Sequence, residues 1–398
     1  MPAENREIAH RGNGVKSYDL FIAGGGISGS VAAKFAAKGG LRTLFVEKCK
    51  TPRTKPCSGI QFKYFEKILG EKIPRDRLCK VQITRTRMYF PDGSSLGARF
   101  SVLNYMRKTF DHWLNGVAQE NGAEFRDECE FLDFVEDQDG VTVTVASRGK
   151  EPEQIKARYA VDATGLSSLP MRRKLRPQDF LEKTAGGGMN YYLDGKADLD
   201  PHTLYQFWDL RFSDAMFAWI YTKTLEDGKN YWVVGTGCTS GDLLERQTPF
   251  YEYVRKKFNM EGRIVQKEEY LTTIDMKSKD KVWLGKGRIL MAGDAAGLMD
   301  GVRGVGQDAA ALSGRLLAKA ILLSDRKKTA ALDEYAKLMG RITTQTRRNQ
   351  EREIRKFATN EELQRYLKKR LVSSGLKFLL QATLNKFRAP EKLRLLPP

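Results

Sequence analysis

The stretch Gly24-Gly25-Gly26-Ile27-Ser28-Gly29 decides the fold of this chain, because the segments on both sides of it match what a nucleotide-binding turn requires. An apolar strand, residues 18–23, leads into the turn, and an alanine-rich helix from residue 30 to about residue 38 follows it. A second apolar strand comes next, at residues 43–47. A glycine-rich turn inside such a strand–helix–strand unit is the signature of an adenine dinucleotide site. The sequence therefore predicts a Rossmann-like domain.

The glycines of this turn have separate roles. Gly24 permits the tight turn, Gly26 lets the backbone approach a pyrophosphate, and Gly29 allows close packing of helix on strand. The pyrophosphate is expected at the helix N-terminus, where free N–H groups favour negative charge. Glu47 is expected to accept hydrogen bonds from a ribose; the alternative is a structural turn, with Glu47 a solvated strand end. The predicted contacts in this unit are Gly24, Gly26, Ile27, Ser28, Gly29, Glu47 and Lys48.

Length and charge limit the classes of protein to which the chain can belong. At 398 residues it exceeds the size at which one hydrophobic core stops growing, so two closely associated domains are expected. The net charge is +19, and residues 341–398 carry 15 Lys and Arg against 5 Asp and Glu. Such a region suits an anionic membrane surface or an acidic electron carrier, or else is a solvated helical face. No base-stacking module or zinc-ligand spacing accompanies it, so specific nucleic-acid recognition is not expected.

The cysteines and the N-terminus indicate the compartment. The cysteines are odd in number and form no CxxC pair, which is typical of a reducing compartment. Residues 1–16 are polar and predict a disordered leader without a signal peptide. No stretch reaches the roughly 18 apolar residues of a membrane span. We therefore expect a cytoplasmic protein, free or bound peripherally to the cytoplasmic face of a membrane.

Periodicity and turn residues divide the rest of the chain. Residues 184–283 are rich in aromatic residues and strand formers, which predicts a mostly antiparallel sheet. The other predicted elements are strands at 81–90, 130–137, 141–146, 155–163 and 288–294, and helices near 62–69, 105–119 and 307–323. The expected fold class is α/β. The predicted divisions are a Rossmann-like domain at 17–183 and 284–340, a substrate domain at 184–283 that residues 81–100 could join, and a basic helical C-terminal region at 341–398.

A second glycine-containing motif, Gly293-Asp294-Ala295-Ala296-Gly297, follows a predicted strand. The strand delivers Asp294 at its carboxyl end, where a carboxylate suits the hydroxyls of a ribityl chain. The run Gly304-Val305-Gly306-Gln307 then opens a helix whose N-terminus can stabilise a partly negative flavin ring. The turn Asp162-Ala163-Thr164-Gly165 ends another strand beside the same site, with Asp162 either contacting the cofactor or only terminating the strand.

These motifs together resemble the FAD-binding framework of p-hydroxybenzoate-hydroxylase-like flavoproteins, and most closely the geranylgeranyl reductase family. The resemblance covers about residues 17–335. The family's R-x-x-F-D pattern is complete in Arg107-Lys108-Thr109-Phe110-Asp111, which implies that Arg107 contacts the flavin cofactor. The family's C-G-G loop is approached by Lys55-Pro56-Cys57-Ser58-Gly59, and its Y-x-W-x-F-P pattern by residues 217–222 without the proline. The usual proline and G-E-G-I after GDAAG are replaced here by Gly301 and residues 304–307.

The resemblance implies an FAD-dependent oxidoreductase that reduces C=C bonds of an isoprenoid or other lipid-like substrate by hydride transfer from flavin N5. Cys57 is the first candidate for the proton donor, and the alternative is a buried inert thiol. Phe217, Trp219 and Tyr221 are expected either to line the substrate site or to pack in the core. The electron donor is NAD(P)H or a reduced carrier protein, because no second GxGxxG context occurs.

Other functions are compatible with the same sequence. The same-fold alternative is a flavin-dependent monooxygenase, whereas a halogenase is disfavoured because no W-x-W-x-I-P stretch occurs. A non-catalytic lipid- or nucleic-acid-binding protein is a distant alternative. His112 and His202 have no partner at metal-ligand spacing, so no metal site is expected. The apolar segment 371–384 either lies in a membrane interface or packs on the body of the protein.

Overall fold

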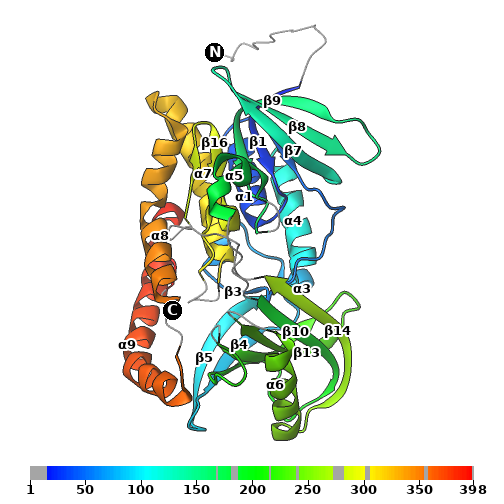
Figure 1. The fold of residues 1–398 in the computed structure, drawn as a ribbon, viewed down its shortest axis with the longest axis vertical. Coiled ribbons are helices and arrows are strands. Elements are labelled where there is room, and N and C mark those ends of the chain that lie inside the picture. Colours follow the sequence, from blue (N-terminus) through cyan, green and yellow to red (C-terminus); the bar gives the residue numbers. More distant parts are fainter. Residues whose placement is uncertain are drawn as a thin grey trace.

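The computed structural model describes residues 16–166, 169–180, 187–214, 217–238, 242–271, 282–300, 305–353 and 357–396. Within these residues the chain forms two eight-stranded sheets with helices packed around them (Figure 1). One sheet carries the glycine-rich turn, and the other is built mainly from the aromatic region of the sequence. This mixed architecture confirms the predicted α/β class.

The first sheet has a parallel centre. Its order is β15-β16-β9-β1-β2-β6, and β8 joins β9 to the antiparallel partner β7. Strand β1 pairs in parallel with both β2 and β9, as a Rossmann-like unit requires. The strands are β1 (Ser17–Ala23), β2 (Thr43–Val46), β6 (Glu124–Arg126), β7 (Cys129–Glu136), β8 (Val141–Ser147), β9 (Glu153–Asp162), β15 (Gly285–Lys286) and β16 (Ile289–Met291).

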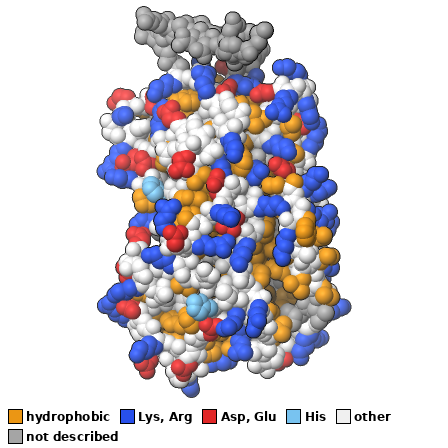
Figure 2. All heavy atoms as spheres, turned by 180° about the vertical axis from the view of Figure 1, so that it is seen from behind, with side chains coloured by type: hydrophobic (Ala, Val, Ile, Leu, Met, Phe, Trp, Pro, Cys, Tyr) orange, Lys and Arg blue, Asp and Glu red, His pale blue; other side chains and the backbone are white. Residues whose placement is uncertain are grey.

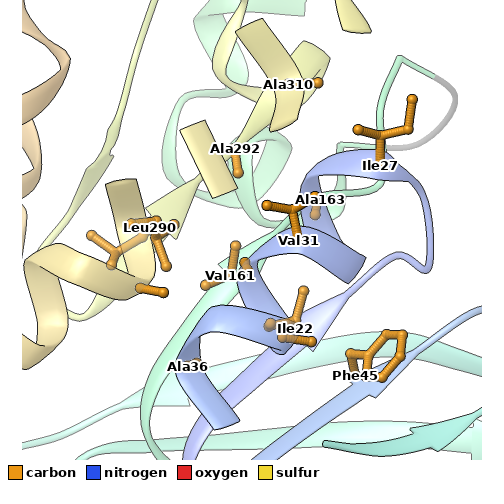
Figure 3. Close-up of a cluster of buried hydrophobic side chains, with 14 of the residues drawn as sticks. Ile22, Ile27, Val31, Ala36, Phe45, Val161, Ala163, Leu290, Ala292 and Ala310 are labelled. Carbon is orange, nitrogen blue, oxygen red and sulfur yellow. The ribbon is translucent and has the colours of Figure 1, made fainter. Parts of the chain in front are cut away.

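The core of this half lies where helices cover the parallel strands. Strand residues such as Ile22 and Val161 lie in one buried cluster with Val31 of α1 and Ala310 of α7 (Figure 3). Helices α1 and α7 approach closely at Gly314, because a Cβ atom there would lie 2.2 Å from the Ser28 carbonyl oxygen. The helices of this half are α1 (Ile27–Lys38), α2 (Phe65–Leu69), α3 (Arg75–Leu78), α4 (Arg107–Glu120), α5 (Pro170–Leu175) and α7 (Gln307–Lys327).

The second sheet follows the order β14-β10-β13-β12-β11-β4-β5-β3. All its pairings are antiparallel except that between β4 and β11, which joins segments more than 100 residues apart. Helix α6 (Leu244–Lys257), which the periodicity did not indicate, covers one face through Phe250 and Val254. The strands are β3 (Ile60–Phe62), β4 (Ile83–Tyr89), β5 (Ser95–Asn104), β10 (Gly187–Lys196), β11 (Thr203–Phe207), β12 (Ala218–Thr224), β13 (Asn230–Cys238) and β14 (Glu261–Leu271).

The predicted helix near 62–69 was placed too early in the chain. Residues up to Phe62 belong to β3, which pairs with β5, and the helix begins at Phe65. Pairing with β5 satisfies the backbone of Ile60 to Phe62, so the strand takes precedence over local helical period.

The C-terminal region is helical, as predicted. Helices α8 (Ala331–Glu353) and α9 (Asn360–Phe387) form a column along one side of the molecule, with α8 beside the first sheet and α9 beside the second (Figure 1). Tyr335 of α8 is buried and donates a hydrogen bond to the Met291 carbonyl oxygen at 3.0 Å. Among the described residues, no helix combines the length and the apolar character that crossing a membrane demands.

Candidate functional site

The glycines of the turn differ in the space around their Cβ positions. Gly24 has a φ of +112°, and a Cβ atom there would lie 2.4 Å from the Ala163 carbonyl oxygen. A Cβ atom at Gly29 would lie 1.9 Å from the Gly24 carbonyl oxygen. At Gly26 the nearest atom is Arg53 Nη2, at an ordinary 3.5 Å. Packing therefore requires glycine at 24 and 29, whereas the protein alone does not explain the glycine at 26.

The end of β2 is held by a network of charged side chains. The buried Glu47 carboxylate accepts hydrogen bonds from Gly25 N at 3.3 Å, Cys49 N at 3.1 Å and Arg53 Nε at 2.8 Å. Protein groups thus already engage both of its oxygens, and a ribose contact stays a prediction. Lys48 is exposed. In the first turn of α1, Ile27 and Ser28 are buried.

The network extends from Arg53 to helix α4. Arg107 forms a bidentate ion pair with Asp111, from Nε to Oδ1 at 2.7 Å and from Nη2 to Oδ2 at 2.8 Å. Arg53 Nη1 lies 3.3 Å from the same Asp111 Oδ2. Burial acts to lower the pKa of Arg107, but the adjacent Asp111 carboxylate raises it above its ordinary value. Arg107 is therefore a fixed cation. Sequence reasoning missed Arg53, because its loop has no periodic pattern; the position of Asp111 four residues after Arg107 was the available signal for this pair.

The turn at 162–165 is held by hydrogen bonds to the carboxylate of its own first residue. Asp162 is fully buried and accepts hydrogen bonds from Thr164 N and Oγ1, at 3.1 and 2.7 Å, and from Met171 N at 3.1 Å. Burial raises the pKa of this carboxyl group. The geometry gives Asp162 the role of holding the turn and the start of α5, and a direct contact with a cofactor stays a prediction. Gly165 has a φ of +73°.

The second motif meets the first one. Gly293, with a φ of +63°, could not carry a Cβ atom without approaching Ser28 Oγ to 2.7 Å. Asp294 is half-buried at the end of β16, and a Cβ atom at Gly306 would lie 3.4 Å from Asp294 Oδ1. Val305 forms a bridge with Asp300 just before α7. Gly304 was also predicted to contact the cofactor, and it lies outside the described residues.

A lysine that the sequence did not single out as a ligand lies between these motifs. The position of a Cβ atom on Gly165 is 3.3 Å from Lys55 Nζ. Burial lowers the pKa of Lys55, Arg107 lowers it further, and Asp294 opposes the shift. The described part of the chain offers this ammonium neither a hydrogen bond nor an ion pair. Lys55 is thus available to an anionic group bound between the glycine turn and Asp294.

Cys57 lies at the N-terminus of α7, where the flavin ring was predicted. Gln307, the first residue of α7, has Nε2 at 3.5 Å from Cys57 Sγ. Gln307 Oε1 accepts a hydrogen bond from the Tyr105 hydroxyl at 2.6 Å. Gly59 has a φ of +60°, and a Cβ atom there would lie 1.8 Å from the Tyr105 carbonyl oxygen. The Cys57 loop is therefore packed closely between α7 and the start of α4.

A buried lysine from the second sheet also holds this loop. Lys223 of β12 donates hydrogen bonds to the carbonyl oxygens of Ser58 and Tyr105, the latter at 3.0 Å. Burial lowers its pKa from the ordinary 10.5 to about 8. Sequence reasoning missed Lys223, although the signal was present: alternation puts it on the same strand face as Trp219 and Tyr221.

The predicted substrate residues share that face. Ala218 and Ile220 instead point to the core beneath α6. Trp219 and Phe217 are half-buried, and Trp219 Nε1 donates a hydrogen bond to Asn190 Oδ1 at 2.8 Å. Gly235 makes room for this bond, because a Cβ atom there would lie 2.2 Å from Trp219 Nε1.

The remainder of this face is packed and partly polar. Tyr221 is only 1% exposed. The neighbouring Tyr192 is fully buried and donates a hydrogen bond to Glu268 Oε2 at 2.8 Å, and burial raises its pKa above the ordinary value. The structure thus gives Tyr221 a packing role in this conformation, whereas Phe217 and Trp219 remain accessible at the edge.

A cavity of about 390 Å³ lies on the other side of the glycine turn. Its lining includes Asn115, whose Nδ2 donates hydrogen bonds to the Gly25 carbonyl oxygen at 2.9 Å and to Ser30 Oγ at 2.8 Å. The cavity is open and polar, and it lies away from Cys57 and the aromatic face. Its other lining residues are Thr51, His112, Gly116, Gln119, Phe125, Arg126 and Asp127.

Comparison with known proteins identifies the family of this chain. The sequence profile of the FAD binding domain matches residues 82–350, more than half of the chain. The chain belongs to this family. The glycine turn precedes the matched segment, so it supports the same cofactor independently.

The relatives confirm the resemblance to geranylgeranyl reductases. The digeranylgeranylglycerophospholipid reductase of Sulfolobus acidocaldarius is 27% identical over 325 residues, covering 77% of this chain and 69% of the relative. The geranylgeranyl diphosphate reductase of Rhodobacter capsulatus is 27% identical over 316 residues, covering 77% and 75%. This flavoprotein is an FAD-dependent oxidoreductase of the geranylgeranyl reductase family.

Solved structures share the fold. A geranylgeranyl bacteriochlorophyll reductase-like protein from Thermoplasma acidophilum has a TM-score of 0.74 at 18% identity, covering 96% of this chain and 94% of that one. The halogenase PltM in complex with phloroglucinol and FAD has a TM-score of 0.66 at 15% identity, covering 93% and 82%. The fold is therefore common to reductases and halogenases, and fold likeness alone does not choose between them.

The residues of this flavoprotein fit FAD. The open space at Gly26 allows a pyrophosphate to approach the N-terminus of α1, where the Arg53 guanidinium supplies a positive charge. The Lys55 ammonium adds a second cation beside Gly165. Asp294 offers a carboxylate between the two glycine motifs, and the N-terminus of α7 faces Cys57. These are the donors and acceptors that the pyrophosphate, ribityl chain and flavin ring of FAD require.

Proposed function

We propose that this flavoprotein reduces C=C bonds in an isoprenoid or other lipid-like substrate. The observation that carries the proposal is the position of Cys57, which lies at the α7 N-terminus in a loop held by Lys223 of β12. A thiol thus lies between the α7 N-terminus and the strand that carries Trp219. The names of the Sulfolobus and Rhodobacter relatives, both reductases of geranylgeranyl compounds, support this substrate class.

Each part of the site has a separate task in this reaction. Bound and reduced FAD supplies the hydride. We assign the pyrophosphate to the turn at 24–29 with Lys55, and the ribityl chain to Asp294. Arg107 keeps the adjoining loop in place through Asp111 and Arg53. We assign the substrate to residues 184–283 together with β4 and β5, beside the half-buried side chains of Phe217 and Trp219.

Reduction of an alkene also needs a proton at the second carbon. We propose the Cys57 thiol as the donor, because its sulfur lies 3.5 Å from Nε2 of Gln307, the first residue of α7. Lys223, with a pKa of about 8, is charged near neutral pH and buried behind the same loop. It holds Cys57 in place through Ser58 and raises the positive potential at the thiol.

The electron donor is the second part of the proposal. We propose transient docking of NAD(P)H or of an acidic carrier protein, because the net charge of +19 would attract either one. The rate of flavin reduction by a carrier should then fall steeply with salt. The odd number of cysteines and the absence of a CxxC pair from the sequence suit a reducing compartment such as the cytoplasm.

The competing function is a flavin-dependent monooxygenase or halogenase, which the fold shared with PltM leaves open. The decisive experiment is anaerobic photoreduction of the purified flavoprotein, followed by titration with a geranylgeranyl lipid. Reoxidation of the flavin by the alkene without oxygen establishes the reductase. A reduced flavin that ignores the alkene but reacts with oxygen establishes the competing class, and a protein that cannot take up FAD excludes both.

A further inference from the structure

Helix α9 carries an apolar face that the described part of the protein leaves uncovered. Five of the ten exposed large hydrophobic side chains of the described residues lie on this one helix, with exposures of 39 to 83%. Their spacing of three, four and seven residues places them on one stripe along the helix. We call this stripe the α9 face: Leu376, Leu379, Leu380, Leu384 and Phe387.

The opposite side of α9 is fixed to the body of the protein. The Phe378 ring lies 5.5 Å from the ring of Phe62 and 5.3 Å from that of Phe100, in β3 and β5. Asn385 is fully buried, and its carbonyl oxygen accepts a hydrogen bond from Lys67 Nζ at 3.3 Å. At 3.6 residues per turn, Phe378 and Asn385 lie about half a turn away from the α9 face. Packing therefore sets the rotation of the helix and directs the α9 face outward.

Basic side chains border the α9 face on both sides. Between Glu362 and Glu391 the chain contains seven Lys and Arg and no acidic residue. Lys377 is exposed along one margin of the stripe and Lys386 along the other. An apolar stripe flanked by lysines is typical of a helix that lies in a membrane interface, with its apolar side chains in the acyl region and its lysines at the phosphate groups.

We propose that the α9 face docks this flavoprotein on an anionic lipid surface. Figure 2 shows hydrophobic side chains gathered along the edge on which Figure 1 places α9, with Lys and Arg around them. The charge pattern favours lipid phosphate over an acidic protein, because lysines border the stripe, and between Leu376 and Phe387 the stripe itself carries no charged group and a single hydroxyl, that of Thr383. Helix α9 packs through Phe378 on the same sheet to which the proposed function assigns the substrate, and in that respect the proposal rests on the proposed function.

The test uses the FAD-loaded protein and sedimentation with vesicles. Wild-type protein should bind vesicles of phosphatidylcholine mixed with phosphatidylglycerol, and salt should weaken the binding. Leu379→Gln/Leu380→Gln/Phe387→Gln should weaken it by at least about tenfold, because three apolar side chains leave the interface. Lys377→Gln/Lys386→Gln should weaken it about fivefold per lysine on the mixed vesicles, and should not change binding to phosphatidylcholine alone.

The matched control is Leu132→Gln/Val135→Gln, which removes two exposed apolar side chains from β7 in the other sheet. This variant should bind as the wild type does. Flavin absorbance of each variant reports that it has folded, and Leu380→Trp should show a blue-shifted emission with mixed vesicles. Vesicle binding does not require alkene reduction, so the vesicle assay tests the docking surface independently of the proposed function.

Two results would overturn the docking surface. One is equal vesicle binding by the wild type and the α9 triple variant, or no binding by either. The other is a wild-type dimer in light scattering that the triple variant converts to a monomer, since the α9 face would then be an interface between two copies of the chain.

Discussion

The contrast between Gly26 and Gly29 makes a quantitative prediction. In Gly29→Ala the new Cβ atom would lie 1.9 Å from the Gly24 carbonyl oxygen, so the turn and helix α1 must separate by about 1 Å or more. Such overpacking should lower the free energy of unfolding by about 1–3 kcal/mol. In Gly26→Ala the nearest atom is Arg53 Nη2 at 3.5 Å, so the free energy of unfolding of the FAD-free protein should change by less than about 1 kcal/mol.

Gly26→Ala should have a large effect on FAD binding, in contrast to its small effect on the free energy of unfolding. The Cβ atom of Gly26→Ala would occupy the space through which the pyrophosphate approaches α1, a steric cost of about 1–3 kcal/mol. Since 1.4 kcal/mol is a factor of ten, the Kd for FAD should rise by about tenfold or more.

The measurements are urea unfolding of the FAD-free proteins and titration with FAD by flavin fluorescence. Gly340→Ala in α8 is the control, because nothing lies within 4 Å of its Cβ position. Wild-type affinity in Gly26→Ala would refute the placement of the pyrophosphate, and wild-type stability in Gly29→Ala would refute the packing argument.

Three further predictions concern the other parts of the site. Asp294→Ala should weaken FAD retention by about tenfold with little change in thermal unfolding, since a half-buried carboxylate leaves without opening a core cavity; unchanged flavin content would contradict its role. Cys57→Ala should keep FAD but slow anaerobic reoxidation by an alkene by about 100-fold or more if the thiol is the acid, and an unchanged rate would move that role elsewhere. Lys223 has its pKa lowered in the folded chain, so its charge destabilises the fold below about pH 8, and this cost disappears between about 8 and 10.5. Over that range the free energy of unfolding of the wild type should rise relative to Lys223→Met by up to about 3 kcal/mol, and parallel urea profiles would show that Lys223 is not the titrating group.

The sequence by itself determined the nucleotide-binding half of this protein. The strand–turn–helix–strand unit around residues 24–29 is local, and Gly29 packs against Gly24 within it, although Gly24 itself packs against the distant Ala163. The same holds for Asp294 and for the start of α7 at Gln307, because a strand end and a helix N-terminus are set by neighbouring residues. The ion pair of Arg107 with Asp111 could also be predicted from the sequence, because the two residues are one helical turn apart.

The tertiary structure alone decided how distant segments meet. No local pattern places Lys223 against the Ser58 and Tyr105 carbonyl oxygens, since that contact depends on the order β12-β11-β4-β5-β3 and on the parallel pairing of β4 with β11.

The orientation of α9 has the same cause. Its sequence is apolar enough for either packing or membrane contact, and the rings of Phe62 and Phe100 against Phe378 determine which side is buried. Turns and periodic elements depend on covalent neighbours, whereas these contacts depend on which surfaces the whole fold brings together.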